Sequence, residues 1–178
     1  MTSLRRRGTA SAPAVADGVP HLVFRVAAEE YALRLTGVRE IVGLEAVEPM
    51  PHAPLAMRGV IQLRGERIAV VDLATALGAR GQDSPESCAL VLAGPVEQGT
   101  ARAAFVVDGV SGVSSLAPGQ MAPAPRLGSL IEAGLVAAVA RADERLLPIL
   151  DVEHLLASPD IRAARQAAWS PAPDGSSA

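Results

Sequence analysis

The chain has no lysine, one cysteine, few aromatic residues and no hydrophobic run long enough to cross a membrane. All sixteen basic residues are arginine, and aromatic residues make up 2% of a chain that is 49% hydrophobic. A membrane helix needs about 20 consecutive apolar residues. A single cysteine excludes an intramolecular disulfide, and the apolar surroundings of Cys88 predict a small core residue in a reducing compartment. These features predict a cytoplasmic protein with an aliphatic core.

Residue patterns that carry catalysis are also scarce. His21, His52 and His154 are far apart and show no metal-ligand spacing. No Walker loop or dinucleotide-binding glycine pattern is present, and Ser114 and Asp108 lie outside any nucleophile motif. The net charge of −3 argues against nucleic acid as the main partner. We therefore predict a protein that is not an enzyme, has no catalytic residues, binds no metal or cofactor, and works through binding surfaces.

The stretch from Arg58 to Leu73 organises our prediction of the fold. Apolar residues alternate on both sides of Arg64-Gly65-Glu66-Arg67, a pattern typical of two half-buried strands joined by a tight turn. Gly65 can supply the positive φ of such a turn. Asp72 can cap a short helix that follows the second strand. The sequence thus predicts a strand, turn, strand and helix unit.

A second copy of this unit is predicted from Gly134 to Leu156. Asp151 occupies the place of Asp72, at an offset of 79 residues. The stretch from Leu33 to Val38 likewise resembles the stretch from Phe105 to Val110, at an offset of 72. A repeat of this length predicts two similar small β subdomains rather than a repeat array. The alternative is a chance similarity between apolar strings in a chain rich in Ala and Val.

Composition also predicts the boundaries. The first twenty residues are rich in Ala, Ser, Gly and Pro without periodicity, which is typical of disorder. Apolar residues Ile161, Ala164 and Ala168 form one stripe of a helix that Asp160 can cap, with Trp169 alongside. The predicted organisation is a dispensable tail over 1–20, a domain over 21–157 with the junction between its subdomains near 79–87, a helix over 158–170, and a second dispensable tail over 171–178.

Several stretches resemble the bacterial chemotaxis adaptor family CheW. They are HLVFRVAAEEYALRL, RGVIQLRGERIAVVDL, VVDGVSGVSSLAPGQ and LLPILDVEHLL, and the resemblance covers roughly His21 to Ala157. It implies a mainly β fold with two five-stranded SH3-like barrels that share an apolar core, with short helices and a C-terminal helix. This agrees with the repeat predicted above.

The resemblance also implies a function. Such a protein would be a non-enzymatic adaptor that couples a CheA-type histidine kinase to the cytoplasmic tips of methyl-accepting chemotaxis receptors, in arrays at the inner membrane. Other CheW-like domains are further potential partners, and direct membrane insertion is not expected. The receptor-facing groove, carried over by position, would contain Leu35, Val38, Glu40, Gly59, Arg64, Ala89 and Val110.

Two alternatives stay open at this point. From the residues alone, Arg64 and Glu40 are more simply explained as solvated rim charges, or as a surface salt bridge between them, than as parts of a binding site. The chain also departs from the family pattern, with Gln62 in place of the usual Asn and Ala69 in place of a frequent Pro. A different functional class, a small β-barrel module or enzyme subunit that holds a ligand in the groove between the barrels, is the competing hypothesis.

Overall fold

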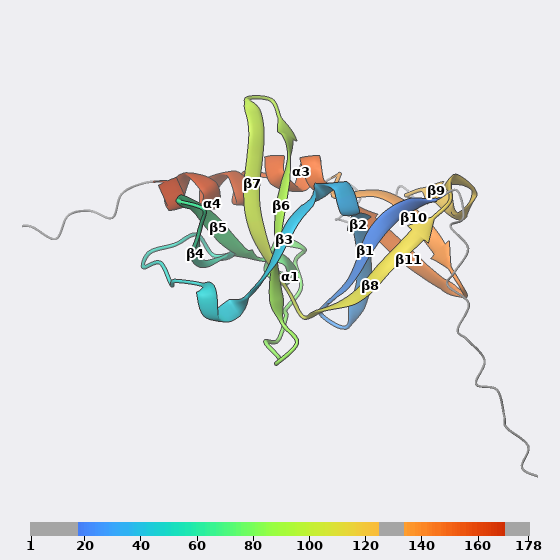
Figure 1. Ribbon diagram of the computed structural model, residues 1–178, viewed down its shortest axis with the longest axis horizontal. Helices are drawn as coiled ribbons and strands as arrows, with labels where there is room; N and C mark the ends of the chain where they lie inside the picture. Colours follow the sequence, from blue (N-terminus) through green and yellow to red (C-terminus); the bar gives the residue numbers. More distant parts are fainter. Residues whose placement is uncertain (1–17, 125–133, 170–178) are drawn as a thin grey trace, which may run out of the picture.

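The chain folds into two twisted β-sheets that lie side by side, with helices along one side (Figure 1). The computed structural model describes residues 18–124 and 134–169. The first sheet has the order β8-β1-β2-β11-β10-β9, and the second has the order β3-β6-β7-β5-β4. Each sheet curls into a small SH3-like barrel, which confirms the predicted fold class. The first sheet has a sixth strand, because the three residues of β9 add to the five predicted.

The bounds of the elements are as follows. The first sheet consists of β1 (Val19–Val26), β2 (Glu29–Arg34), β8 (Gly109–Leu116), β9 (Met121–Pro123), β10 (Val136–Ala142) and β11 (Arg145–Leu150). The second consists of β3 (Val38–Gly43), β4 (Met57–Leu63), β5 (Glu66–Asp72), β6 (Cys88–Val96) and β7 (Gly99–Val107). The helical elements are η1 (Leu35–Gly37), η2 (Leu44–Ala46), α1 (Leu73–Ala76), η3 (Pro118–Gln120), α3 (Val152–Ala157) and α4 (Pro159–Trp169).

Both predicted hairpin units are present. Arg64 and Gly65 form the turn between β4 and β5 with φ values of 51° and 82°, the backbone of a two-residue type I′ hairpin. The turn is shorter than predicted, since β5 begins at Glu66. Asp72 caps α1 by accepting a hydrogen bond from the Thr75 N–H at 2.8 Å. Asp151 caps α3 in the same way.

The repeat is also confirmed, down to the register of the parallel strand pairs. Val70 of β5 pairs with Ala104 of β7 in the second sheet, and Ile149 of β11 pairs with Ala32 of β2 in the first. Ile149 follows Val70 by 79 residues and Ala104 follows Ala32 by 72, which are the two predicted offsets. Equivalent residues therefore make equivalent pairs, and chance similarity is excluded.

The two subdomains are not consecutive halves of the chain. The chain leaves the first sheet at η1 to form β3 in the second, and returns at Asp108 to form β8 in the first. The prediction of a junction near 79–87 was wrong, because these residues connect α1 to β6 within the second subdomain. Their polar composition marks a surface loop. Composition does not determine which sheet the strands on either side join.

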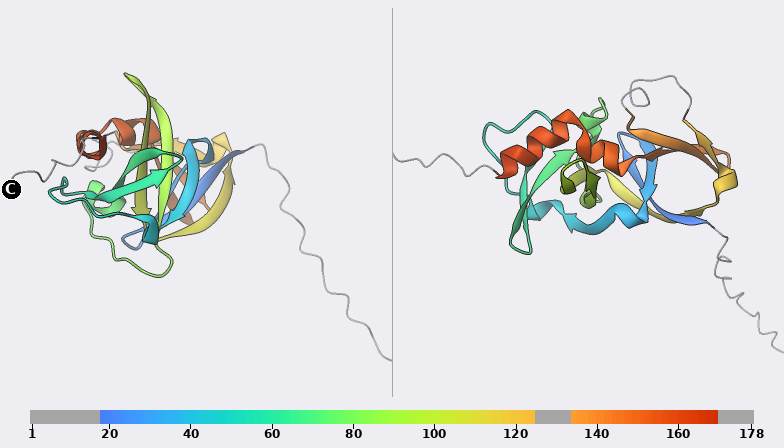
Figure 2. Two further views of the ribbon diagram at one scale, coloured as in Figure 1. Left: turned by 60° about the vertical axis from the view of Figure 1, so that its left-hand side comes forward. Right: turned by 90° about the horizontal axis from the view of Figure 1, so that it is seen from above.

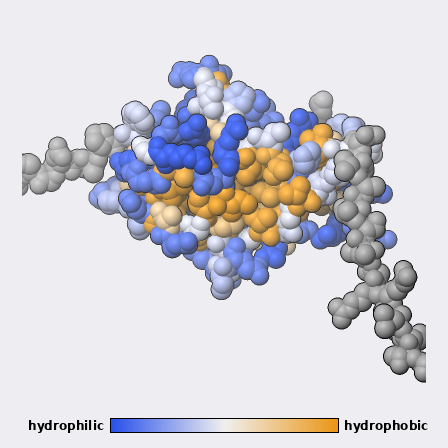
Figure 3. Space-filling model, in the orientation of Figure 1, coloured by the Kyte–Doolittle hydropathy of each residue, from blue (hydrophilic) through white to orange (hydrophobic). Residues whose placement is uncertain are grey.

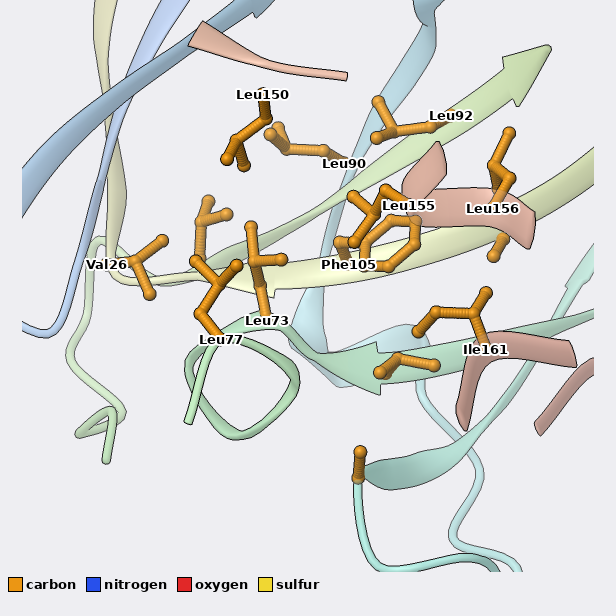
Figure 4. Packing of buried hydrophobic residues seen from close by; sticks show 14 of the residues in the cluster. Val26, Leu73, Leu77, Leu90, Leu92, Phe105, Leu150, Leu155, Leu156 and Ile161 are labelled. Carbon is orange, nitrogen blue, oxygen red and sulfur yellow. The ribbon is translucent and has the colours of Figure 1, made fainter. Parts of the chain in front are cut away.

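The core lies between the two sheets and is closed by α3 and α4. Figure 4 shows Phe105 of β7 beside Leu155, with Leu90, Leu156 and Ile161 nearby. Two smaller buried clusters fill the barrels themselves. This arrangement is the shared apolar core that the family resemblance implies.

The C-terminal helix buries the predicted stripe. Ile161, Ala164 and Ala168 are all buried. Asp160 lies in the first turn of α4 rather than at its cap, and Trp169 points away from the core, since its side chain is 82% exposed.

The first strand begins earlier than predicted. Val19 already pairs with Leu116, so β1 starts two residues before His21. The predictions for residues 1–17 and 171–178 lie outside the described residues. No helix in the described part of the chain is long and apolar enough to cross a membrane.

Candidate functional site

A β-bulge in β3 determines which of its side chains share a face. Val38 pairs with Leu92 and Ile41 pairs with Leu90, with Arg39 as the extra residue. Directly opposed residues point to the same side of a sheet. Leu90 and Leu92 are buried in the shared core. The bulge therefore places both Val38 and Ile41 on the face that carries this core.

The same bulge occurs at the equivalent place in β8. Val110 pairs with Phe24 and Val113 pairs with Leu22, and Ser111 is the extra residue. Phe24 and Leu22 also belong to the shared core. The positions of Val110 and Val113 in the first sheet are thus equivalent to those of Val38 and Ile41 in the second. Each pair of equivalent residues is separated by 72 positions in the sequence.

Because β3 and β8 are outer strands of their sheets, the shared core is open to solvent along them. Three of the four side chains are exposed, Ile41 by 47%, Val110 by 36% and Val113 by 60%. Leu35 of η1, just before β3, is also partly buried against the shared core. We call the set of Leu35, Val38, Ile41, Val110 and Val113 the apolar margin. Figure 3 shows an apolar area over β3 that continues toward β1 and β8. Exposed apolar patches of this kind mark interaction sites.

A pair of opposite charges borders the apolar margin. Nη2 of Arg64 lies 3.4 Å from Oε2 of Glu40, and the side chains are 82% and 34% exposed, respectively. Glu40 pairs with Val91, which belongs to the core of the second barrel. Glu40 therefore points to the opposite side of the outer strand β3 from Val38 and Ile41. An exposed pair contributes about 1 kcal/mol or less to stability, so both charges are available to a partner.

Two of the predicted groove residues lie beneath this surface. Ala89 is fully buried in the core of the second barrel. Gly59 is buried with a φ of 153°, and a Cβ there would collide with the backbone carbonyl of Glu48. That close approach allows Glu48 to bridge Val60 and connect the outer strand β4 to the chain after η2. Ala89 and Gly59 therefore support the surface and do not line it.

The sequence prediction missed Ile41 and Val113. Both follow an apolar residue of the predicted site by three positions, and strict alternation places such a residue on the opposite face. The bulges reverse this alternation. The available signal was the repeat itself, since Val38 and Ile41 have the same spacing as Val110 and Val113.

The described residues offer little reactive chemistry. No group of His, Cys, Asp and Glu within residues 18–124 and 134–169 is arranged to hold a metal ion. Burial raises the pKa of the Cys88 thiol above its ordinary value, so this group is protonated at neutral pH and is a weak nucleophile.

Comparisons of sequence identify the relatives of the chain. Residues 20–160 match the family model described as CheW-like domain. A chemotaxis protein CheW from Klebsiella aerogenes is 30% identical over 144 residues, which is 81% of this chain and 85% of that protein. A probable chemotaxis protein CheW from Rhizobium etli is 29% identical over 143 residues, which is 80% of this chain and 90% of that protein.

A solved structure agrees with these matches. The scaffolding protein TtCheW from Thermoanaerobacter tengcongensis superimposes with a TM-score of 0.70 at 25% sequence identity, covering 80% of this chain and 95% of that protein. The fold and the order of its motifs are thus those of known chemotaxis proteins. The chain belongs to the CheW-like family.

Proposed function

We propose that the protein is a non-enzymatic adaptor that couples a CheA-type histidine kinase to the cytoplasmic tips of methyl-accepting chemotaxis receptors. It works in the cytoplasm, in receptor arrays at the inner membrane. Membership in the CheW-like family supports a role in chemotaxis. The description of the TtCheW structure as a scaffolding protein supports an adaptor rather than an enzyme.

The observation that carries the proposal is the apolar margin with its bordering ion pair. An amphipathic receptor helix can place its apolar side chains against Ile41, Val110 and Val113. Because β3 is an outer strand, Arg64 and Glu40 on its other side are within reach of the polar side chains of the same helix. The planar guanidinium of Arg64 provides directional hydrogen bonds that fix the register of the helix.

Kinase binding is assigned to an end of a barrel. The regulatory domain of CheA-type kinases resembles this fold, so two barrels meet end to end. At the end of the second sheet, β4 is an outer strand and Leu55, in the loop before it, is almost fully exposed. Pairing between strand edges requires an outer strand and an apolar side chain, and both are present here.

Arg64 provides the first test. We expect Arg64→Ala to weaken binding of a receptor-tip fragment at least tenfold, because truncating an interfacial charge leaves its partners unpaired at a cost of about 2 kcal/mol or more. The melting temperature should stay nearly unchanged, since the ion pair with Glu40 is exposed. Titration of the fragment and thermal unfolding are measured on the same preparations. Arg64→Lys should restore binding only in part.

Arg141→Ala is the matched control. Arg141 is also an exposed arginine, and it lies on β10, which three strands of the first sheet separate from β8. It should change neither binding nor melting temperature. Unchanged binding by Arg64→Ala would refute the site, and equal losses of binding and stability would make Arg64 a structural residue.

The competing hypothesis of a ligand-binding module is tested by size-exclusion chromatography with kinase and receptor fragments. Co-elution of the three proteins supports the adaptor. A thermal shift with small ligands in the absence of co-elution would favour the ligand-binding module.

A further inference from the structure

A second hollow surface lies on a different part of the molecule, between α4 and the β6–β7 hairpin. The hairpin projects beyond the rest of the second sheet (Figure 1), and Figure 2 shows α4 running beside it. The hollow has a volume of about 1010 Å³. We call it the arginine groove, after Arg67 of β5, Arg102 of β7, and Arg162 and Arg165 of α4, which line it. It shares no residue with the apolar margin.

The charge of the arginine groove is opposite to that of the chain. Four arginines and two glutamates, Glu66 and Glu97, line it, which gives a net charge of +2 on a protein whose net charge is −3. Arg102 is already engaged, since its Nη1 lies 2.5 Å from a carboxylate oxygen of Glu66. The groove therefore attracts negatively charged groups.

Two of the arginines are free to bind such groups. No acidic side chain of the described residues forms an ion pair with Arg67 or Arg165, whereas Arg162 donates a hydrogen bond to the carbonyl of Ala157 at 2.9 Å. Guanidinium groups bind carboxylates through two parallel hydrogen bonds. Carboxylates are thus the ligand groups that best fit the open positions.

An aromatic side chain lies at one end of the arginine groove. Trp169 lines the groove at the end of α4 and is 82% exposed, although the same helix buries Ile161, Ala164 and Ala168. Trp and Arg are the residues most enriched at the centres of protein interfaces. An exposed Trp next to unpaired Arg indicates a partner with both acidic and apolar side chains.

We propose that the arginine groove binds an acidic, extended peptide segment of a partner protein, with at least one apolar side chain against Trp169. A peptide can enter the hollow between α4 and the projecting hairpin. A flat anionic membrane matches the shape of a hollow between a helix and a projecting hairpin less well than a peptide does. The protein thus has a third binding surface, separate from those assigned to receptor and kinase.

The test uses the full chain and a synthetic peptide of Glu and Asp residues with one central Leu, labelled with fluorescein. Binding is followed by anisotropy of the label and by the emission of Trp169, which is the only tryptophan in the chain. We expect saturable binding that weakens with salt and shifts the Trp169 emission. A peptide with Gln and Asn in place of the acidic residues should not bind.

The variant Arg67→Glu/Arg165→Glu should weaken binding at least tenfold. Arg141→Glu is the matched control, because Arg141 is an exposed arginine on β10 in the other subdomain, and it should change affinity by less than about twofold. Thermal unfolding of each variant shows whether it is folded. If the double variant unfolds, Arg67→Gln/Arg165→Gln takes its place.

Three results would overturn the proposal. Equal weakening by Arg141→Glu would show a general attraction of charges. Binding to phosphatidylserine vesicles without binding to the peptide would show a membrane surface. Self-association that the double variant abolishes, without peptide binding, would show an interface between copies of this chain.

Discussion

At the scale of single residues, Tyr31 shows how the core changes the chemistry of a side chain. It is the only tyrosine in the chain, it is buried, and it stacks on Phe24 with ring centroids 6.4 Å apart. Its hydroxyl donates a hydrogen bond to Glu29 at 3.0 Å. Burial, followed by this hydrogen bond and the negative charge of Glu29, raises the pKa of Tyr31 to about 12.

This pKa predicts a loss of stability at alkaline pH. The pKa of the folded state lies above the ordinary value of 10.0, so the stabilisation is fully present below about pH 10 and is lost as the pH rises toward 12. Ultraviolet titration of the phenolate should give a midpoint near 12 in the native protein and near 10 in denaturant. Tyr31→Phe should remove this part of the pH dependence of unfolding. A native midpoint near 10 would contradict the burial of the hydroxyl.

Residue-level prediction from sequence succeeded where a residue acts locally. The caps Asp72 and Asp151 and the positive φ of Gly65 depend on a few neighbouring residues, and all three are present. The burial of Ala89 was not predicted. It depends on the second barrel closing around it, which involves strands far away in sequence.

At the scale of elements, the sequence predicted the hairpins and the repeat. It predicted neither the passage of the chain between the sheets at β3 and β8 nor the two bulges. Hairpins follow from alternation and turn residues over about sixteen positions. A bulge and a strand partner depend on packing between segments more distant in sequence. The apolar margin results from both, so only part of this margin, Leu35, Val38 and Val110, could be predicted.

The repeat predicts that Leu33 and Phe105 have equivalent roles in the core. Both are fully buried in the shared cluster. We expect Phe105→Ala to cost about 3 to 5 kcal/mol and Leu33→Ala about 2 to 5 kcal/mol in free energy of unfolding, measured with denaturant. Leu146→Ala, on an exposed side chain of β11, should cost less than about 0.5 kcal/mol. A small effect of Phe105→Ala would show that its packing contributes little.

At the scale of the whole molecule, β1 defines where the folded unit begins. His21 is buried, and its Nδ1 lies 2.7 Å from the carbonyl oxygen of Val19, to which Nδ1–H donates. Val19 and Pro20 also pair with β8. The predicted dispensable tail of twenty residues therefore includes two residues of the sheet.

Truncation tests this boundary. A chain that starts at Gly18 should unfold like the full-length protein. A chain that starts at His21 loses the pairing of Val19 and Pro20 with β8. It also leaves a buried imidazole without its partner, which costs about 1 to 3 kcal/mol. Thermal unfolding of the two truncated chains separates these outcomes. Equal stability of both would show that Val19 and Pro20 contribute nothing to the sheet.

The chain passes from the first sheet to the second at β3 and returns at β8. This path also limits how the protein can fold during its synthesis on the ribosome. Three N-terminal strands have a neighbour that is synthesised later. These neighbours are β8 for β1, β11 for β2, and β6 for β3. The second sheet has all five of its strands once β7 is synthesised, whereas the first sheet cannot be completed before β11. Until then the nascent chain presents unpaired strand edges and apolar side chains, which are the features that lead to aggregation and engage chaperones. The strands of the second barrel can thus pair before those of the first, but the shared core stays open until α3 and α4 are synthesised, near the end of the chain.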